Sequence, residues 1–149
     1  MIYTMQTKKA MRITFIAHKD QVDKTGMPYV FHPYHLAEQM ADEASVCVAL
    51  LHDVVEDTDI TFDDLREMGI SEDVISSLVL LTHNKEVLYA DYIQSIKDSG
   101  DRIAITVKLA DLRHNSDISR FELIDEKAVE SCGRYMEAIK QLEGLFTQP

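Results

Sequence analysis

The sequence predicts an all-α protein that forms one helical domain. Apolar residues recur at the spacing of helices, and no segment sustains the apolar–polar alternation of a strand. Glycine and proline total only eight residues and act as punctuation along the chain. A chain of 149 residues suits one domain with one core, so we expect residues 1–149 to form a single domain of about seven helices.

Four helices are expected in the first half of the chain, at about 5–19, 32–40, 43–56 and 62–68. A loop rich in turn-forming residues, 20–28, separates the first two, and Pro33 suits the first turn of the second helix. The third contains the apolar run 46–51, and a helix that is apolar on most sides belongs in the middle of a domain. The fourth begins after Thr61, a good capping residue, and stops before Gly69.

Helices at about 71–83, 88–98, 101–115 and 125–146 complete the second half. Ser71 is expected to cap the first of them, with Glu72 and Asp73 near its positive end. The last helix carries a stripe of residues that step by four and three, which predicts a face packed on the core. These residues are Ala128, Cys132, Tyr135, Ile139 and Leu142.

The acidic composition excludes some classes of partner. A net charge of −11 argues against binding to long DNA or RNA, because that binding relies on clustered Lys and Arg side chains. It leaves open a small phosphate ligand, which a metal ion and a few local lysines can bind. The longest apolar stretch, Ala44 to Leu51, falls far short of the roughly 20 residues that a membrane span needs, so no membrane contact is expected.

The cysteines and the N-terminus favour the cytoplasm. Cys47 and Cys132 lie within apolar helical patterns, as expected of buried thiols in a reducing compartment. Residues 1–19 contain no uninterrupted apolar run before a cleavage site, so no secretory signal is expected.

Ionisable residues at the edge of the most apolar helix are the most unusual feature of the sequence. His52 and Asp53 follow the apolar run directly, and Glu56 lies one turn later on the same face, beside Asp57. Because burying a carboxylate without a partner is costly, a metal ion or another cation is expected nearby.

Two further helices repeat this arrangement. Asp111 follows the apolar segment 107–110, with His114 and Asn115 after it, and His32 opens another helix. Two imidazoles and two carboxylates suit a divalent ion that keeps positions open for water and substrate, and Mn, Fe and Zn all fit this description. The predicted ligands are His32, His52, Asp53 and Asp111.

A metal ion in such a set polarises a phosphoryl oxygen and lowers the pKa of bound water, and Glu56 and Asp57 would orient that water or move a proton to the leaving oxygen. A single His–Asp pair, however, is more often a helix end or a salt bridge. Lys108 is either a phosphate contact or an ion-pair residue. The other histidines are expected at the surface or beside the ligands: His18, His35 and His83.

Three blocks of sequence resemble the hydrolase domain of the RelA/SpoT family, within the HD superfamily, and especially its small stand-alone relatives. They run from Ala17 to Pro33, from Ala49 to Thr58 and from Val107 to Asn115. They occur in family order within about residues 10–120, and the second block is the most specific.

The resemblance implies hydrolysis of guanosine tetra- or pentaphosphate, with release of pyrophosphate from the 3′ position and Mn as the usual metal. It implies that His32, His52, Asp53 and Asp111 hold the metal and that Glu56 and Asp57 form the catalytic acidic pair. It further implies that Lys24, Thr25 and Asn115 contact the nucleotide. No synthetase domain is expected within this chain.

The sequence departs from the family at three places. Asp23 replaces a basic residue, Leu112-Arg113 replaces Arg-Leu, and Ile118 stands where a small hydroxyl residue is common. We expect the Asp23 charge to repel a polyanionic nucleotide and weaken its binding, unless the side chain turns away to pair with Lys19 or Lys24. Two alternatives therefore stay open: a phosphatase of the same fold acting on another nucleotide, such as a 5′-monophosphate, and a module that senses a nucleotide without turnover. The intact pair Glu56-Asp57 disfavours the second.

Overall fold

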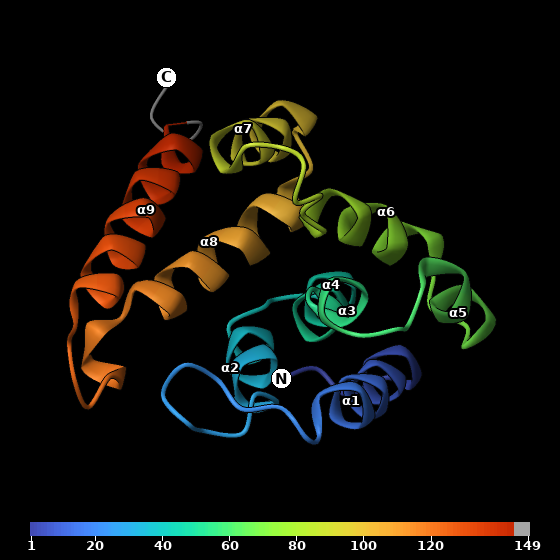
Figure 1. Ribbon diagram of the computed structural model, residues 1–149. Helices are drawn as coiled ribbons and strands as arrows, with labels where there is room; N and C mark the ends of the chain where they lie inside the picture. Colours follow the sequence, from blue (N-terminus) through green and yellow to red (C-terminus); the bar gives the residue numbers. More distant parts are fainter. Residues whose placement is uncertain (145–149) are drawn as a thin grey trace.

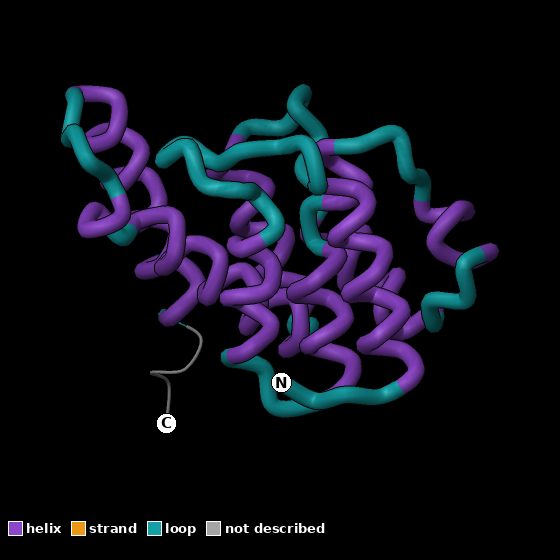
Figure 2. The backbone as a smooth tube through the Cα atoms, turned by 90° about the horizontal axis from the view of Figure 1, so that it is seen from below, coloured by secondary structure: helices purple, strands orange, loops and turns teal. Residues whose placement is uncertain are grey.

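Helices joined by loops and turns make up residues 1–144, the part that the computed structural model describes (Figure 1). Within this part, nine α-helices and one 3-10 helix follow one another: α1 (Met5–His18), α2 (Phe31–Glu38), α3 (Glu43–Leu51), α4 (Val54–Asp57), α5 (Phe62–Glu67), α6 (Glu72–Leu81), α7 (Tyr89–Ser99), α8 (Arg102–Ser116), η1 (Ile118–Arg120) and α9 (Glu126–Glu143). Figure 2 shows no strand among these residues; an isolated bridge joins Val22 to Pro28. The all-α prediction is confirmed.

One expected helix is broken in two. The apolar pattern predicted a continuous helix over 43–56, but the chain leaves helical hydrogen bonding at His52 and Asp53 and starts again as α4. With this break the eight expected ranges become nine described α-helices, and the 3-10 turn brings the described elements to ten, above the predicted total of about seven.

The predicted caps differ in outcome. The Thr61 side chain accepts a hydrogen bond from the Asp64 amide, and the Asp64 side chain bonds back, so α5 begins with a capping box. Ser71 occupies the capping position of α6, but its side chain makes no capping hydrogen bond.

The apolar helix α3 lies at the centre, as predicted. Residues 46–51 are completely buried. Figure 1 shows α3 nearly end-on, between α1 on one side and α6 and α8 on the other; α3 also packs against α2. This position places the chain that leaves α3, and therefore His52 and Asp53, deep in the molecule.

The last two helices pack against each other as a pair. On α9, Ala128, Cys132 and Leu142 are buried, and Tyr135 and Ile139 pack partly buried against the rest, as the stripe predicted. The expected extension of this helix to 145–146 lies outside the described residues. Both cysteines are free and buried. No helix in the described part of the chain combines the length and apolar character that a membrane span requires.

Asp101 fixes the start of α8 and is expected to contribute to stability. Its Oδ1 accepts hydrogen bonds from the amides of Ile103 and Ala104, at 2.9 and 3.0 Å, and its Oδ2 accepts one from the Ser77 hydroxyl at 2.7 Å. Asp101→Ala should therefore lower the free energy of unfolding by about 1 kcal/mol, measured by urea denaturation. Asp98→Ala, at an exposed position near the end of α7, is the control and should change it little; equal effects would show that the cap is unimportant.

Candidate metal centre

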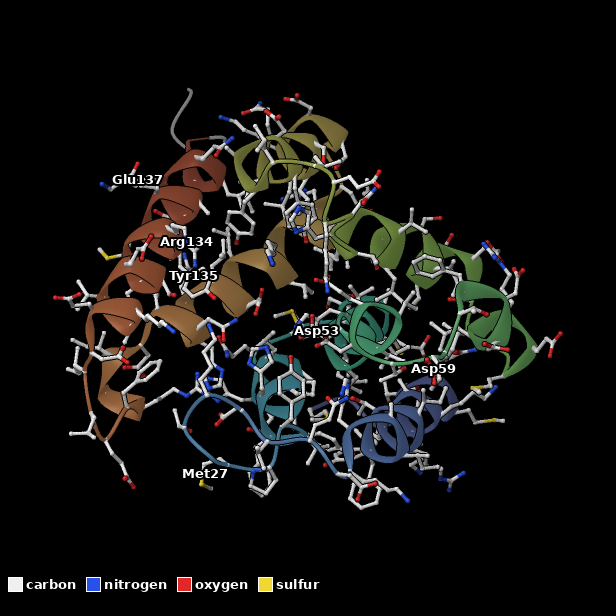
Figure 3. All side chains as sticks on the ribbon, in the orientation of Figure 1. Met27, Asp53, Asp59, Arg134, Tyr135 and Glu137 are labelled. Carbon is white, nitrogen blue, oxygen red and sulfur yellow. The ribbon has the colours of Figure 1, made fainter. Side chains whose placement is uncertain are left out.

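The four predicted metal ligands converge from three parts of the chain. His32 lies at the start of α2, His52 and Asp53 lie between α3 and α4, and Asp111 lies on α8. The two Nε2 atoms of the histidines are 3.3 Å apart. His52 Nε2 lies 2.9 Å from Asp53 Oδ2, and His32 Nε2 lies 3.2 Å from Asp111 Oδ1. Ligand atoms of His32, His52 and Asp53 all fall within 4.8 Å of one another, a grouping that could hold a metal ion. Figure 3 shows Asp53 near the middle of the molecule.

Hydrogen bonds on the far side of each histidine ring orient these nitrogen atoms. His52 Nδ1 donates to the carbonyl oxygen of Ala49 at 2.8 Å, which leaves the Nε2 lone pair directed at the cluster. His32 Nδ1 lies 2.6 Å from His114 Nδ1, and the two rings stack with centroids 4.9 Å apart. Such outer contacts fix the tautomer and the orientation of ligand histidines.

Burial makes the charges of this cluster strongly dependent on one another. His32 and His52 are each 4% exposed and Asp111 is 5% exposed. Burial alone would lower the pKa of His52, but the carboxylates of Asp53 and Asp111 outweigh it and raise the pKa to about 9. Burial would raise the pKa of Asp111, but the Lys108 ammonium and the histidines hold it well below its ordinary value. Both effects show an anionic carboxylate set that attracts positive charge.

Tyr29 is a residue of this centre that the sequence analysis missed. Its hydroxyl donates a hydrogen bond to Asp53 Oδ2. Burial and the nearby Asp53 charge raise the pKa of Tyr29 above its ordinary value, so the phenol stays a donor. The Tyr29 ring also lies against the rings of His18 and His32. Its position one turn before His32 is the signal that could have identified it.

Asp111 is held through both of its oxygen atoms. The Asn115 amide donates to Oδ1 at 2.5 Å, and Lys108 Nζ lies 2.8 Å from Oδ2. The Lys108 ammonium also lies 5.3 Å from the centroid of the Tyr92 ring. Of the two readings of Lys108, the ion pair is therefore the one observed, and it is buried.

Replacing Lys108 is expected to destabilise the fold, because it leaves the buried Asp111 carboxylate without its cation. Lys108→Met should lower the free energy of unfolding by roughly 3 kcal/mol. Added Mn²⁺ should then stabilise the variant more than the wild type, since a bound cation replaces the lost charge. Both quantities are measured by urea denaturation with and without Mn²⁺.

Lys140→Met is the matched control for this experiment. Lys140 pairs with Glu137 at the same spacing of three residues, but on the surface, with side chains 69% and 77% exposed. Its loss should change stability by about 1 kcal/mol or less. Equal effects of the two substitutions would contradict the role assigned to Lys108.

The predicted acidic pair lies on α4, directly after Asp53. Glu56 Oε2 accepts a hydrogen bond from the His83 amide at 3.1 Å, which joins α4 to the segment after α6. Asp57 is more exposed. Partial burial of its carboxyl group and the charges of Asp53 and Glu56 raise the pKa of Asp57 to about 6. Both residues thus lie on the short helix that follows Asp53, and the carboxyl group of Asp57 senses the Asp53 charge.

A cleft of about 240 Å³ opens beside the ligand cluster and contains all three predicted nucleotide contacts. It is lined by Val22, Asp23, Lys24, Thr25, Tyr29, His32, Asn115, Arg120, Phe121 and Tyr135. Lys24 Nζ donates to the Tyr135 hydroxyl at 2.9 Å, and Figure 3 shows Tyr135 on the side of α9 that faces α8. Helical spacing predicted Tyr135 only as a core residue, and no pattern in the sequence pointed to Arg120.

Asp23 does not carry the unpaired charge that the sequence analysis expected. Its Oδ2 lies 2.6 Å from Arg120 Nη2, and its side chain is 13% exposed. The alternative partners were also wrong: Lys19 lies 4.0 Å from Asp20, and Lys24 bonds Tyr135. The partner lies 97 residues further along the chain, so local spacing could not have predicted it.

The other two departures from the family lie away from the cleft lining. Leu112 is completely buried in the core, and Arg113 points outward and pairs with Glu143 on α9 at 2.7 Å. Ile118 is 49% exposed. Asp23 is therefore the departure that bears on the cleft.

The remaining histidines divide between the two expected locations. His18 is buried and its Nδ1 lies 2.7 Å from Gln21 Oε1. His35 is exposed, and its ring lies 4.4 Å from that of His114. His83 Nε2 lies 2.8 Å from the carbonyl oxygen of Val87.

Comparison with known proteins extends these observations. No family model matches the chain. It is 32% identical over 146 residues to a GTP pyrophosphokinase of Streptomyces coelicolor, which covers 87% of this chain and 17% of that protein. It is 33% identical over 120 residues to the bifunctional (p)ppGpp synthase/hydrolase SpoT of Escherichia coli, which covers 72% of this chain and 17% of that protein. The chain thus spans about one sixth of the length of these relatives.

A third relative has a higher sequence identity over a shorter segment. Over 54 residues, or 34% of this chain and 8% of the relative, the chain is 43% identical to a guanosine-3′,5′-bis(diphosphate) 3′-pyrophosphohydrolase of Aquifex aeolicus.

A solved structure shares the fold over nearly the whole chain. It belongs to a metazoan ortholog of SpoT that hydrolyses ppGpp and plays a role in starvation responses; the TM-score is 0.76 at 22% identity, covering 97% of this chain and 89% of that chain. This match confirms the expected helical HD-domain fold. Sequence and fold together therefore show that this chain resembles the (p)ppGpp hydrolase domain of the RelA/SpoT family.

Proposed function

We propose that the protein is a metal-dependent 3′-pyrophosphohydrolase of guanosine tetra- or pentaphosphate, with Mn as its metal. The observation that carries the proposal is the convergence of His32, His52, Asp53 and Asp111 beside a cleft that contains Lys24 and Asn115. The names of the relatives point to the same reaction, among them the 3′-pyrophosphohydrolases.

The donor atoms suit a divalent ion. Two imidazole nitrogens and two carboxylates form a ligand set that leaves coordination positions for water and substrate. An ion held there supplies Lewis-acid polarisation of a phosphoryl oxygen and a nucleophile near neutral pH.

The protein side chains supply the remaining parts of the reaction. Glu56 is oriented by the His83 amide through Oε2, which leaves Oε1 to accept a proton from the attacking water. Asp57, the next residue along α4, would transfer a proton to the ribose 3′ oxygen, which leaves as a hydroxyl group while the attacked phosphorus departs in pyrophosphate. Lys24, Thr25 and Asn115 hold the nucleotide in the cleft.

The product released from a panel of nucleotides tests this proposal. With Mn²⁺, the protein should release pyrophosphate from guanosine 3′,5′-bis(diphosphate), and a chelator should stop the reaction. Release of inorganic phosphate from a 5′-monophosphate instead would favour a phosphatase acting on another nucleotide. Binding of guanosine tetraphosphate without any product would favour a sensing module.

A further inference from the structure

An ion pair joins the two walls of the cleft. Arg120, at the end of η1, donates from Nη2 to Asp23 Oδ2 at 2.6 Å and from Nη1 to the carbonyl oxygen of His114 at 2.8 Å. The side chains are 21% and 13% exposed, so water screens the pair only partly. Figure 1 shows that the loop between α1 and α2, which carries Asp23, approaches the turn between α8 and α9.

The same carboxylate organises the loop itself. Asp23 Oδ1 accepts hydrogen bonds from the Thr25 amide at 2.8 Å, the Thr25 hydroxyl at 2.6 Å and the Met27 amide at 3.1 Å. Lys24 lies inside this turn, and its ammonium reaches Tyr135 on the opposite wall. Asp23 therefore fixes two cations, Arg120 by direct contact and Lys24 through the backbone.

The cleft lining is not acidic, although the whole chain is. The net charge is −11, yet among the described residues that line the cleft, Lys24 and Arg120 face a single carboxylate, which Arg120 neutralises. Arg120 uses one N–H on each terminal nitrogen in these two hydrogen bonds, and a guanidinium has further N–H groups to offer a ligand. A planar guanidinium held in place is suited to bidentate recognition of phosphate.

We infer that Arg120 is a substrate-binding residue that contacts a phosphate group of the nucleotide other than the one attacked at the metal centre, and that Asp23 is its positioning residue. The inference rests on the proposed function for the identity of the nucleotide. In this chain the negative residue of the loop thus supports anion binding, because it holds a cation from another element over the cleft.

Binding of guanosine 5′-diphosphate tests the inference without turnover, since this probe lacks the 3′ diphosphate that the reaction would remove. Isothermal titration of the full chain should give a dissociation constant that Arg120→Gln raises roughly tenfold to a hundredfold, the range for a lost hydrogen bond to a charged group. Asp23→Asn should raise it only about two- to fivefold, because Arg120 remains but is less ordered. Arg113→Gln is the matched control; Arg113 pairs with Glu143 away from the cleft and its loss should have no effect.

The double variant distinguishes two roles of Arg120: direct contact with the nucleotide, and a purely structural role in holding the loop that carries Asp23. If Arg120 acted only by holding the loop, Asp23→Asn, Arg120→Gln and the double variant would weaken binding equally, and that result would overturn the inference. We expect the double variant to bind as weakly as Arg120→Gln. Arg120→Lys should recover part of the affinity, because it keeps the charge and loses the fork. Melting temperatures of all variants identify any that fail to fold. If Arg120→Gln fails to fold, the affinity of Arg120→Lys for guanosine 5′-diphosphate decides the test in its place.

Failure of the proposed function can be told apart from failure of this inference. A wild-type protein that hydrolyses no nucleotide but binds guanosine 5′-diphosphate through Arg120 would contradict the reaction and retain the contact. A wild-type protein that hydrolyses guanosine tetraphosphate with the same Michaelis constant before and after Arg120→Gln would contradict the contact and retain the reaction.

Discussion

Asp53→Ala is expected to abolish metal binding and hydrolysis together. The Asp53 carboxylate lies 2.9 Å from His52 Nε2 and accepts the Tyr29 hydroxyl, so its removal takes away a charged ligand and the group that orients its neighbours. A metal site that loses an anionic ligand loses charge and geometry at once. Metal content per chain after dialysis against Mn²⁺, measured by mass spectrometry, and pyrophosphate release should both fall to background.

Asp59→Ala is the matched control for this substitution. Asp59 is an exposed aspartate in the loop between α4 and α5, and Figure 3 shows it well away from Asp53. This variant should keep wild-type metal content and activity. Circular dichroism of Asp53→Ala checks that it still folds. Full metal occupancy in a folded Asp53→Ala protein would refute the assignment of this ligand.

Glu56→Gln should reduce turnover by roughly two to four orders of magnitude while leaving metal content unchanged, the range expected for a positioned acid–base group. Glutamine keeps the size of the side chain, and its carbonyl oxygen can still accept the His83 amide, so the position of α4 should be preserved. The substitution removes only the basic oxygen and its charge. The turnover number at saturating guanosine tetraphosphate, with metal content measured on the same sample, provides the test.

The outcome for Glu56 separates two roles. Near wild-type turnover in a metal-loaded Glu56→Gln protein would mean that Glu56 acts only as the acceptor of the His83 amide. Glu67→Gln, on the exposed part of α5, is a control for the loss of one negative charge and should leave turnover unchanged.

Helical periodicity predicted most of the fold because each helix has to bury one face. The apolar run of α3 and the stripe on α9 were both placed correctly, as was the capping box at Thr61. The break at His52 was not predicted, since no glycine or proline marks it. It accompanies contacts with distant residues: His52 points at His32, and Asp53 accepts a bond from Tyr29.

The candidate site was predicted from residue types, but its supporting contacts were not. Ionisable residues at the ends of apolar segments indicated the metal site: His32, His52, Asp53 and Asp111. Arg120 gave no such signal, because its role depends on a partner 97 residues away. The same distance explains why the charge of Asp23 was misjudged: a sequence shows which charges are present, while the fold decides which of them are neutralised.

The burial of α8 has a consequence for how such a protein can change during evolution. Residues on nearly every side of this helix are buried, and the same helix carries Lys108 and Asp111. A substitution on α8 disturbs the packing of the core and the metal centre together, so few substitutions will be tolerated. The loop around Asp23 and the turn around Arg120 contribute little to the core, and paired changes in them cost little stability. New ligand preferences should therefore arise in this loop and this turn, through substitutions that change which of them carries the positive and which the negative side chain. The sequence of α8 should stay nearly constant from one descendant to the next.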